Sequence, residues 1–233
     1  MTSAGGELRR EARRAGAVLW KDLLTERRTK ANFNAVVFFA GLVLVLFGFA
    51  LGPDAQTLRL AASGVIWLTV LFSGILAFNR SYQSELEGGA LESLLLYPGD
   101  RRAIFVGKLL ANLAFVLLVE CLVVPMAAVL YDVPLFHALP GLAGIILLGT
   151  LGFVTLGTFY AAMASRVRTR EVMLPLLLFP MLVPLLLAAV TCTRALLEGD
   201  LMGDARTWIR LLVAFDVIFL AATLAAFEYV IED

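Results

Sequence analysis

Charged residues are scarce in this sequence, at 16% of its 233 residues, whereas a soluble domain usually contains about 25%. Histidine occurs once and cysteine twice, which is too little for a zinc site or for a disulfide-stabilised secreted domain. Cys121 and Cys192 form neither C-x-x-C nor C-x-x-C-H, so we expect both to be small buried apolar residues. The low charge also argues against a soluble enzyme and against a disordered chain.

Sequence motifs of catalysis are missing as well. No G-x-x-x-x-G-K-[ST] occurs, so we do not expect the chain to bind a nucleotide in a P-loop. H-E-x-x-H and a Ser/His/Asp set are also absent, and we interpret His137 as a residue of a surface turn. The sequence therefore predicts no catalytic site and neither a metal nor a cofactor bound by this chain.

Hydrophobic residues are abundant, at 61% of the chain, with a mean hydropathy of +0.89. A helix that crosses a bilayer needs roughly 20 mostly apolar residues. Six segments meet that requirement, at about 33–51, 60–78, 109–130, 139–164, 173–190 and 209–230. The alternation typical of a membrane β-barrel strand is missing. We therefore predict an all-α, polytopic membrane protein, with a segment at 1–32 followed by a six-helix transmembrane domain at 33–233.

The 19 basic and 19 acidic residues sum to zero net charge, but they are unevenly distributed. Fifteen lysines and arginines lie in the N-terminal segment and in the connections after the second and fourth spans, against four on the opposite side. Because basic residues favour the cytoplasmic side of a membrane protein, we expect both termini to be cytoplasmic. This preference already explains the arginines of the N-terminal segment, so we expect no nucleic-acid partner.

Residues 8–30 have the pattern of an amphipathic helix that lies on the membrane surface. Apolar residues recur at steps of three and four, with charged residues on the rest of the turn; they are Leu8, Ala12, Ala15, Leu19 and Leu23. Trp20 is suited to the depth of the lipid headgroups. The alternative is a solvated charged tail that only satisfies the preference for basic residues on the cytoplasmic side.

The longest internal connection, residues 79–108, is predicted to contain a short cytoplasmic helix from about Ala90 to Tyr97. Ser84 and Glu87 fit a capping box, but the two glycines that follow would weaken a helix beginning there. The helix would present leucines with glutamates nearby, namely Leu91, Leu94, Leu95, Glu85, Glu87 and Glu92. The leucines either pack back onto the ends of the bundle or insert into a groove on another protein.

Two carboxyl groups fall well inside predicted spans, away from their ends, where an acidic side chain is unfavourable and often functional. Glu120 is either a protonated, hydrogen-bonded group between helices or part of a polar pathway or switch. Asp216 is expected to pair with Arg210, Arg194 or Arg206, and the alternative is a functional role.

The fifth span contains Pro175, Pro180 and Pro184. Each proline removes a backbone donor and favours a kink. They either shape this helix or act as a hinge.

Several stretches resemble the CcmB family, the membrane permease subunit of the haem exporter-type ABC complex of cytochrome c maturation. The resemblance covers nearly the whole chain and rests on an ordered set of segments. They are LWKDLLTERRTK, GVIWLTVLFSGILAFNRSYQSELEGGALESLLLYP, VGKLLANL, LGTLGFVTLGTFYAAMASRVRTREVMLPLLLFPMLVPLLLAAV and AFDVIFLAATLAAFEYVIED.

The resemblance implies a bacterial inner-membrane protein with six spans that works as a pair. It implies a cytoplasmic ATPase partner (CcmA), which binds ATP and Mg²⁺, and the membrane proteins CcmC and CcmD. ATP hydrolysis by that partner is thought to release the haem-loaded chaperone CcmE, so haem belongs to the wider complex. Residues 85–96 match the coupling helix region that docks on the ATPase, and residues 8–30 match the connecting helix.

We therefore expect a permease subunit without catalysis of its own, which converts the motion of a partner ATPase into rearrangement of the bundle. One alternative is an ABC permease that exports another substrate, such as a lipid or drug. Another is a small membrane enzyme built on Glu120 and Asp216.

Overall fold

The computed structural model describes residues 4–87, 101–133, 139–164, 170–199 and 205–232. Within these residues the chain is helical, with short turns and no strand. The helices are α1 (Ala4–Thr29), α2 (Ala31–Leu51), α3 (Ala55–Glu87), α5 (Arg101–Leu130), α6 (Leu139–Ala164), α7 (Arg170–Glu198) and α8 (Ala205–Glu232). Helices α2, α3 and α5 to α8 each contain a stretch long and apolar enough to cross a membrane. The prediction of an all-α protein with six spans is confirmed.

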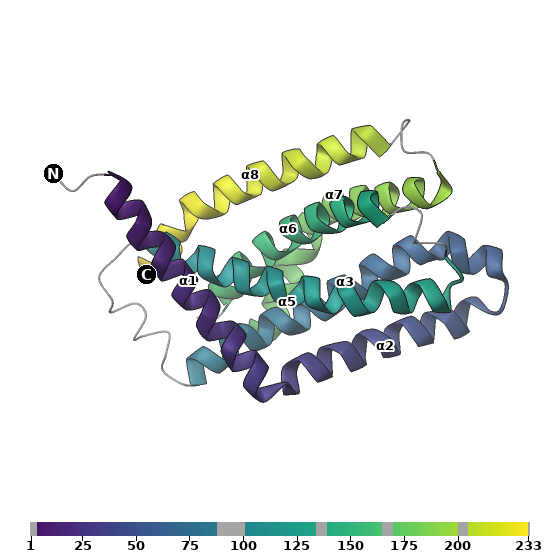
Figure 1. Cartoon of the computed structure of the whole chain (residues 1–233), viewed down its shortest axis with the longest axis horizontal. Helices are drawn as coiled ribbons and strands as arrows, with labels where there is room; N and C mark the ends of the chain where they lie inside the picture. The colour runs from purple at the N-terminus through teal and green to yellow at the C-terminus, as the bar shows by residue number, and fades with distance from the viewer. Residues whose placement is uncertain (1–3, 88–100, 134–138, 165–169, 200–204, 233) are drawn as a thin grey trace.

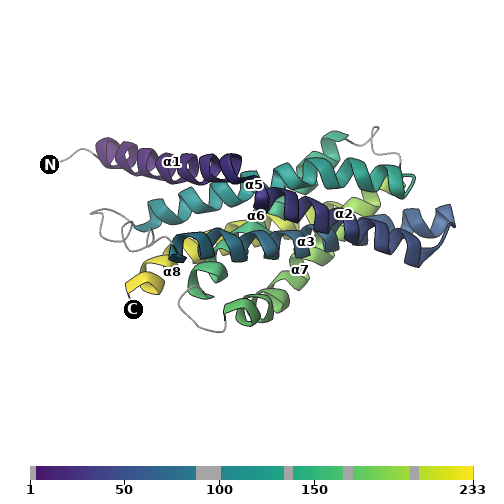
Figure 2. The same ribbon diagram turned by 90° about the horizontal axis from the view of Figure 1, so that it is seen from below.

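The six spans form an elongated bundle, and α1 crosses it near the end that holds both termini (Figure 1). The turned view places α1 on one side of the bundle (Figure 2). The beginning of α5 lies at the same end, and the α2–α3 turn lies at the opposite end (Figure 1). Helix α6 packs against α3, α5, α7 and α8, so it occupies the centre of the bundle. Helices α2 and α8 are the least buried spans.

The junctions between the first three helices are fixed by two side-chain carboxylates. Lys30 separates α1 from α2 in a left-handed conformation, with φ of 50°. The Glu26 carboxylate accepts the Phe33 backbone N–H at 2.8 Å, which satisfies a free donor at the beginning of α2. Asp54 accepts the Thr57 hydroxyl and backbone N–H at 2.6 and 2.8 Å. These bonds, the hydroxyl contact foremost, lower the pKa of the Asp54 carboxyl below its usual value.

Close approach of α3 and α6 depends on glycines of α6. A Cβ atom on Gly149 would lie 2.2 Å from the Trp67 ring, and one on Gly157 would lie 2.1 Å from the Phe78 ring. Small residues allow membrane helices to pack closely, because lipid supplies little hydrophobic force between them. The Trp67 indole also donates a hydrogen bond to the Thr193 hydroxyl of α7 at 2.9 Å. This aromatic side chain therefore joins three spans.

Helix α3 extends beyond its membrane span. The second span was predicted at 60–78, and the stretch of α3 that could cross a membrane is Ala55–Asn79, so the predicted span is confirmed. The helix itself continues to Glu87, so Ser84 lies inside α3 and does not begin a new helix. A helix does not need apolar residues to continue beyond the membrane.

Candidate functional site along helix α5

Among its described residues, helix α5 has three buried polar side chains, although it contains an apolar membrane span. Lys108 is 1% exposed, Asn112 is 6% exposed and Glu120 is 2% exposed. Each polar group buried in a low-dielectric environment needs a partner; the partner of Lys108 lies on α1, and the partners of Asn112 and Glu120 lie on α6. We consider this series the candidate functional site, because it joins the N-terminal helix to the central helix of the bundle.

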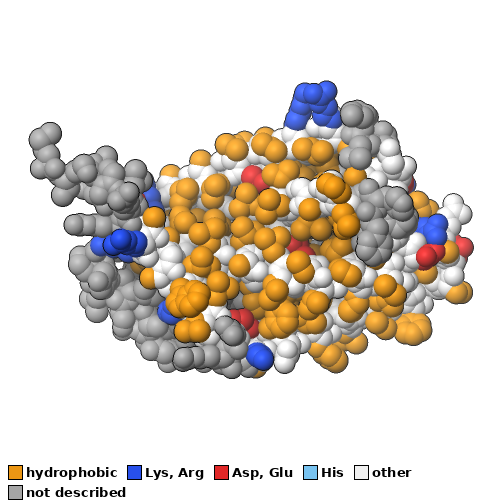
Figure 3. Space-filling view, in the orientation of Figure 1, with side chains coloured by type: hydrophobic (Ala, Val, Ile, Leu, Met, Phe, Trp, Pro, Cys, Tyr) orange, Lys and Arg blue, Asp and Glu red, His pale blue; other side chains and the backbone are white. Residues whose placement is uncertain are grey.

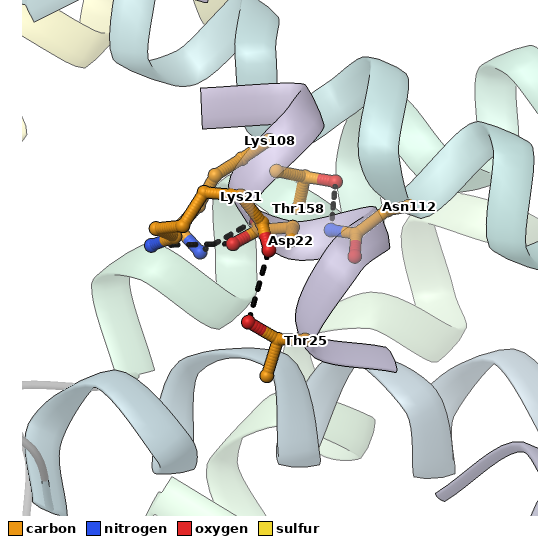
Figure 4. Close-up of polar contacts among 6 residues, drawn as sticks. All are labelled: Lys21, Asp22, Thr25, Lys108, Asn112 and Thr158. Carbon is orange, nitrogen blue, oxygen red and sulfur yellow. Dashed lines mark hydrogen bonds and ion pairs between the residues drawn. The ribbon is translucent and has the colours of Figure 1, made fainter. Parts of the chain in front are cut away.

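Lys108 connects α5 to α1 through an ion pair. Its Nζ atom lies 3.4 Å from Asp22 Oδ2, and the Lys21 ammonium lies 3.2 Å from Asp22 Oδ1 (Figure 4). The Thr25 hydroxyl donates to the Lys21 carbonyl oxygen one turn away at 2.9 Å (Figure 4). Because the Lys108 side chain is withdrawn from solvent, the Asp22 carboxylate supplies the opposite charge that its burial requires.

The apolar contact beside this ion pair is equally close. Ala15 and Val18 of α1 are buried, and a Cβ atom on Gly107 of α5 would lie 2.7 Å from the Ala15 carbonyl oxygen and from Val18 Cβ. Glycine at position 107 therefore lets the two helix backbones approach. Ala15, Val18 and Asp22 form the docked face of α1. Together with Gly107 and Lys108 of α5, they make up what we call the α1–α5 contact.

The α1–α5 contact gives the N-terminal helix a packed face that the sequence pattern did not predict. A helix was expected at 8–30 and is present as α1. However, Ala12 and Leu23 are exposed, and Val18, which was not in the predicted set, is buried. Trp20 is 67% exposed. The face of α1 that packs on Gly107 of α5 is set by that glycine, and the hydrophobic pattern of α1 alone does not reveal it.

One turn further along α5, Asn112 contacts the central helix. Its side-chain amide donates to the Thr158 hydroxyl of α6 at 3.0 Å (Figure 4). Both side chains are buried. This neutral hydrogen bond fixes the register of α5 against α6 within the membrane-spanning region.

Glu120 makes the next polar contact with α6. The Thr150 hydroxyl donates to Glu120 Oε1 at 2.7 Å, whereas Glu120 Oε2 has no hydrogen-bond partner among the described residues. Glu120 lines a narrow crevice between α2, α3 and α5, together with Val36, Val70, Ser73, Gly74, Phe115, Val116 and Val119. The Ser73 hydroxyl in that crevice is also buried and without a partner in the described part of the chain. Glu120 was expected to be a hydrogen-bonded carboxyl between helices or part of a polar pathway. Its Oε1 atom makes such a hydrogen bond, whereas Oε2 does not in the described part of the chain.

Asp216 does not form the ion pair that was predicted for it. Both of its carboxyl oxygens are buried without a hydrogen-bond partner among the described residues. Arg194 instead pairs with Glu198 at 2.8 Å, and Arg206 and Arg210 are exposed. Arginines at the ends of membrane helices extend toward water, which removes them from an acid inside the span. Asp216 packs into the notch at Gly152 of α6, where a Cβ atom would lie 2.5 Å from Oδ1.

The face of the molecule in Figure 3 is covered by hydrophobic side chains between its two ends, with lysines and arginines at its margins. Exposed large apolar residues are numerous on α2, including Phe38, Leu42, Leu46 and Phe49. Such a surface suits a hydrocarbon environment. It is the expected exterior of a membrane-spanning bundle.

The predicted coupling residues lie largely outside the described part of the structure. Leu91, Glu92, Leu94 and Leu95 fall in residues 88–100, and the side chains of Glu85 and Glu87 are likewise outside it, although their backbone belongs to α3. Their role stays a prediction.

Helix α7 continues through all three candidate hinge residues, Pro175, Pro180 and Pro184. Pro180 and Pro184 are exposed on its surface, and the side chain of Pro175 is outside the described set. The hinge assignment stays a prediction.

Sequence reasoning missed most of the partners in this site. Lys108 was counted only as a basic residue of a connection, and Asp22 only as part of a charged face. A signal was present, because Asp22 follows Ala15 and Val18 at steps of three and four and so shares their face of α1. Thr150 and Thr158 of α6 gave no comparable signal, since threonine is common in membrane helices.

Comparison with known proteins gives a consistent family assignment. The model of the family described as CcmB protein matches residues 13–231. The chain is 30% identical to Heme exporter protein B of Pseudomonas aeruginosa, over 86% of this chain and 87% of that protein. It is 33% identical to the protein of the same name from Rhodobacter capsulatus, over 78% and 84% of the two chains. The corresponding Paracoccus denitrificans protein is 30% identical, over 88% and 92%.

Proposed function

The chain belongs to the CcmB family, and on this basis we propose that it is the membrane permease subunit of a haem-exporting ABC complex that serves cytochrome c maturation. The observation that carries the proposal is the similarity to Heme exporter protein B over most of the chain. The six apolar spans suit a permease. Since the sequence has no P-loop motif, ATP hydrolysis is assigned to a separate partner subunit and no catalytic activity to this chain.

The contacts along α5 suggest how motion of such a partner reaches the bundle. Helix α1 is held to α5 by Asp22 and Lys108, and to the beginning of α2 by Glu26. A displacement of α1 would therefore move both spans. Helix α5 is joined to α6 through Asn112 and Glu120, so the displacement would extend to the centre of the bundle. This route supports mechanical coupling as the role of the subunit.

The partners and location follow from the family. We assign the chain to the bacterial inner membrane, as a multi-pass protein with both termini cytoplasmic. A CcmA-like ATPase, CcmC- and CcmD-like membrane proteins, a CcmE-like haem chaperone and a second copy of the chain complete the proposed complex. Haem belongs to this wider complex, and ATP with Mg²⁺ belongs to the ATPase.

The leucines of the connection between α3 and α5 are the proposed contact with the ATPase. Changing Leu91, Leu94 and Leu95 together to aspartate should abolish co-purification of the ATPase in mild detergent, because charged side chains would not enter an apolar groove. Membrane insertion should be unaffected. Gln56→Asp, an exposed position at the opposite end of the bundle, is the control and should leave recovery of the ATPase unchanged. Normal recovery with the triple variant would refute this contact.

Complementation tests the substrate. In a strain that lacks its own CcmB-like subunit but retains the other components, expression of this chain should restore covalent haem attachment to c-type cytochromes. The Q56D variant should restore it equally. A chain that inserts and recovers the ATPase but restores no c-type cytochrome would instead indicate export of another substrate, such as a lipid or drug.

A further inference from the structure

Basic residues are unexpected at the end of the bundle that lies opposite the two termini, because they favour the cytoplasmic side of a membrane protein. Four arginines nevertheless lie near the start of α3, the end of α7 and the start of α8: Arg59, Arg194, Arg206 and Arg210. Two of them are neutralised by a carboxylate, since Arg59 pairs with Asp132 and Arg194 pairs with Glu198. The two arginines of α8 need a different explanation.

Arg206 and Arg210 are neighbours on the surface of α8. Both are exposed, and no ion pair or side-chain hydrogen bond joins either of them to another residue in the described part of the chain. Side chains four residues apart lie on one face of a helix, one turn from each other. Two adjacent guanidinium groups without a protein carboxylate point to an anion that comes from outside the chain.

Apolar side chains continue the same face of α8 into the membrane. Val213 and Val217 follow Arg210 at steps of three and four, so they share its face of the helix. Val213, Val217 and the adjacent Ile218 are 42%, 63% and 61% exposed. Branched side chains of this size suit contact with lipid chains, whereas contacts between membrane helices favour small residues. The face therefore has a cationic end and an apolar stretch that follows it.

The depth of the two arginines matches that of a lipid phosphate. The membrane-spanning stretch of α8 ends at Phe227, 17 residues after Arg210, which is about 26 Å along the helix. The hydrocarbon core of a bilayer is about 30 Å thick. Arg210 therefore lies at the boundary between hydrocarbon and headgroups, and Arg206 lies one turn closer to water.

We propose that Arg206 and Arg210 bind the phosphate of an anionic phospholipid, whose acyl chains lie along Val213, Val217 and Ile218. A guanidinium group donates two parallel hydrogen bonds to phosphate oxygens, and a phosphate between the two arginines accepts from both. An anionic headgroup is preferred to that of phosphatidylcholine, because it has no ammonium group that competes with the arginines for the phosphate. The site goes beyond the proposed function, since it requires neither haem nor an ATPase.

Native mass spectrometry of the full chain in detergent tests the site directly, by titration with phosphatidylglycerol and with phosphatidylcholine of the same chain length. The wild type should bind phosphatidylglycerol more tightly. The double variant Arg206→Gln with Arg210→Gln should weaken that binding roughly 30-fold, the combined effect of two basic residues near an anionic headgroup. Equal binding of both lipids by the wild type, or unchanged binding by the double variant, would overturn the proposal; the first result would favour an acidic protein surface as the partner.

The matched control is the double variant Arg59→Gln with Arg194→Gln. It removes the same positive charge from the same end of the bundle, but from arginines that already have a carboxylate partner. Its affinity for phosphatidylglycerol should match that of the wild type. A loss as large as that of the α8 variant would show that only net charge attracts the lipid, which would refute a site on α8.

A second variant of the same positions keeps the charge. Arg206→Lys with Arg210→Lys should bind phosphatidylglycerol more tightly than the glutamine variant, because an ammonium group also attracts phosphate. Both positions are exposed, so these replacements leave the packing of the bundle intact. Equal affinities of the lysine and glutamine variants would refute phosphate as the ligand.

Discussion

The two ends of the polar series on α5 bury charge-bearing groups in different ways. At the α1–α5 contact, Lys108 lies against the Asp22 carboxylate, with Lys21 close by. Twelve residues further along, Glu120 is bonded only to the neutral Thr150 hydroxyl, and its second oxygen has no partner among the described residues. Helix α1 brings an opposite charge to the first position, whereas the described residues that line the crevice beside Glu120, and its partner Thr150, are neutral. The first contact should therefore depend on charge and the second on hydrogen bonding.

Asp22→Ala gives the largest effect expected of this comparison. It removes the carboxylate from a lysine that is 1% exposed, and breaking a buried ion pair by deleting one partner lowers stability by about 3 kcal/mol. We expect that decrease in the free energy of unfolding of the purified full chain, measured by denaturant titration in detergent. Helix α1 should also become accessible to protease.

The double variant Asp22→Leu with Lys108→Met is the control for that experiment. It removes both charges and keeps side-chain volume, so it should be clearly more stable than D22A. If D22A and the double variant unfold alike, or if D22A matches the wild type, charge does not hold α1 to α5.

Gly107→Ala is expected to have the second-largest effect. The new Cβ atom would lie 2.7 Å from the Ala15 carbonyl oxygen and from Val18 Cβ, and overpacking of this kind lowers stability by roughly 1–3 kcal/mol. The helix backbones would have to separate, which also lengthens the Asp22–Lys108 pair. Unfolding of the full chain in detergent measures the loss.

A matched control for G107A exists in α6. Gly144 is exposed and has nothing within 4 Å of its Cβ position, so Gly144→Ala should be neutral or slightly stabilising. Equal stabilities of G107A and G144A would contradict a close α1–α5 contact.

The six spans were predictable from the sequence because the bilayer imposes one strong condition, about 20 apolar residues in a row. The docked face of α1 was not predictable from the sequence of that helix, because it depends on Gly107, which is in another segment of the chain. The continuation of α3 to Glu87 was not predictable from hydropathy either, because residues 79–87 are mostly polar. The ion pair predicted for Asp216 was wrong because sequence proximity to arginines does not show which way those arginines point. The family, by contrast, was predicted correctly from ordered segments spread over the chain.

Two single variants, Thr150→Val and Thr158→Val, should cause the smallest losses of stability, and they compare the two hydrogen bonds that α5 makes to α6 within the membrane. Each removes one hydroxyl of α6 and keeps the side-chain volume. Thr158→Val takes a neutral acceptor from Asn112, and interhelical hydrogen bonds of this kind contribute about 0.6 kcal/mol on average. Thr150→Val takes the donor from Glu120 Oε1 and leaves both carboxyl oxygens without a partner among the described residues, so we expect a loss of about 1–2 kcal/mol. In detergent, T150V should therefore have a lower free energy of unfolding than T158V. The reason is that a buried carboxyl group that has lost its hydrogen-bond donor is less favourable than a buried amide that has lost its acceptor. The reverse order would show that Glu120 obtains its stabilisation from elsewhere in the bundle and that Thr150 does not orient it.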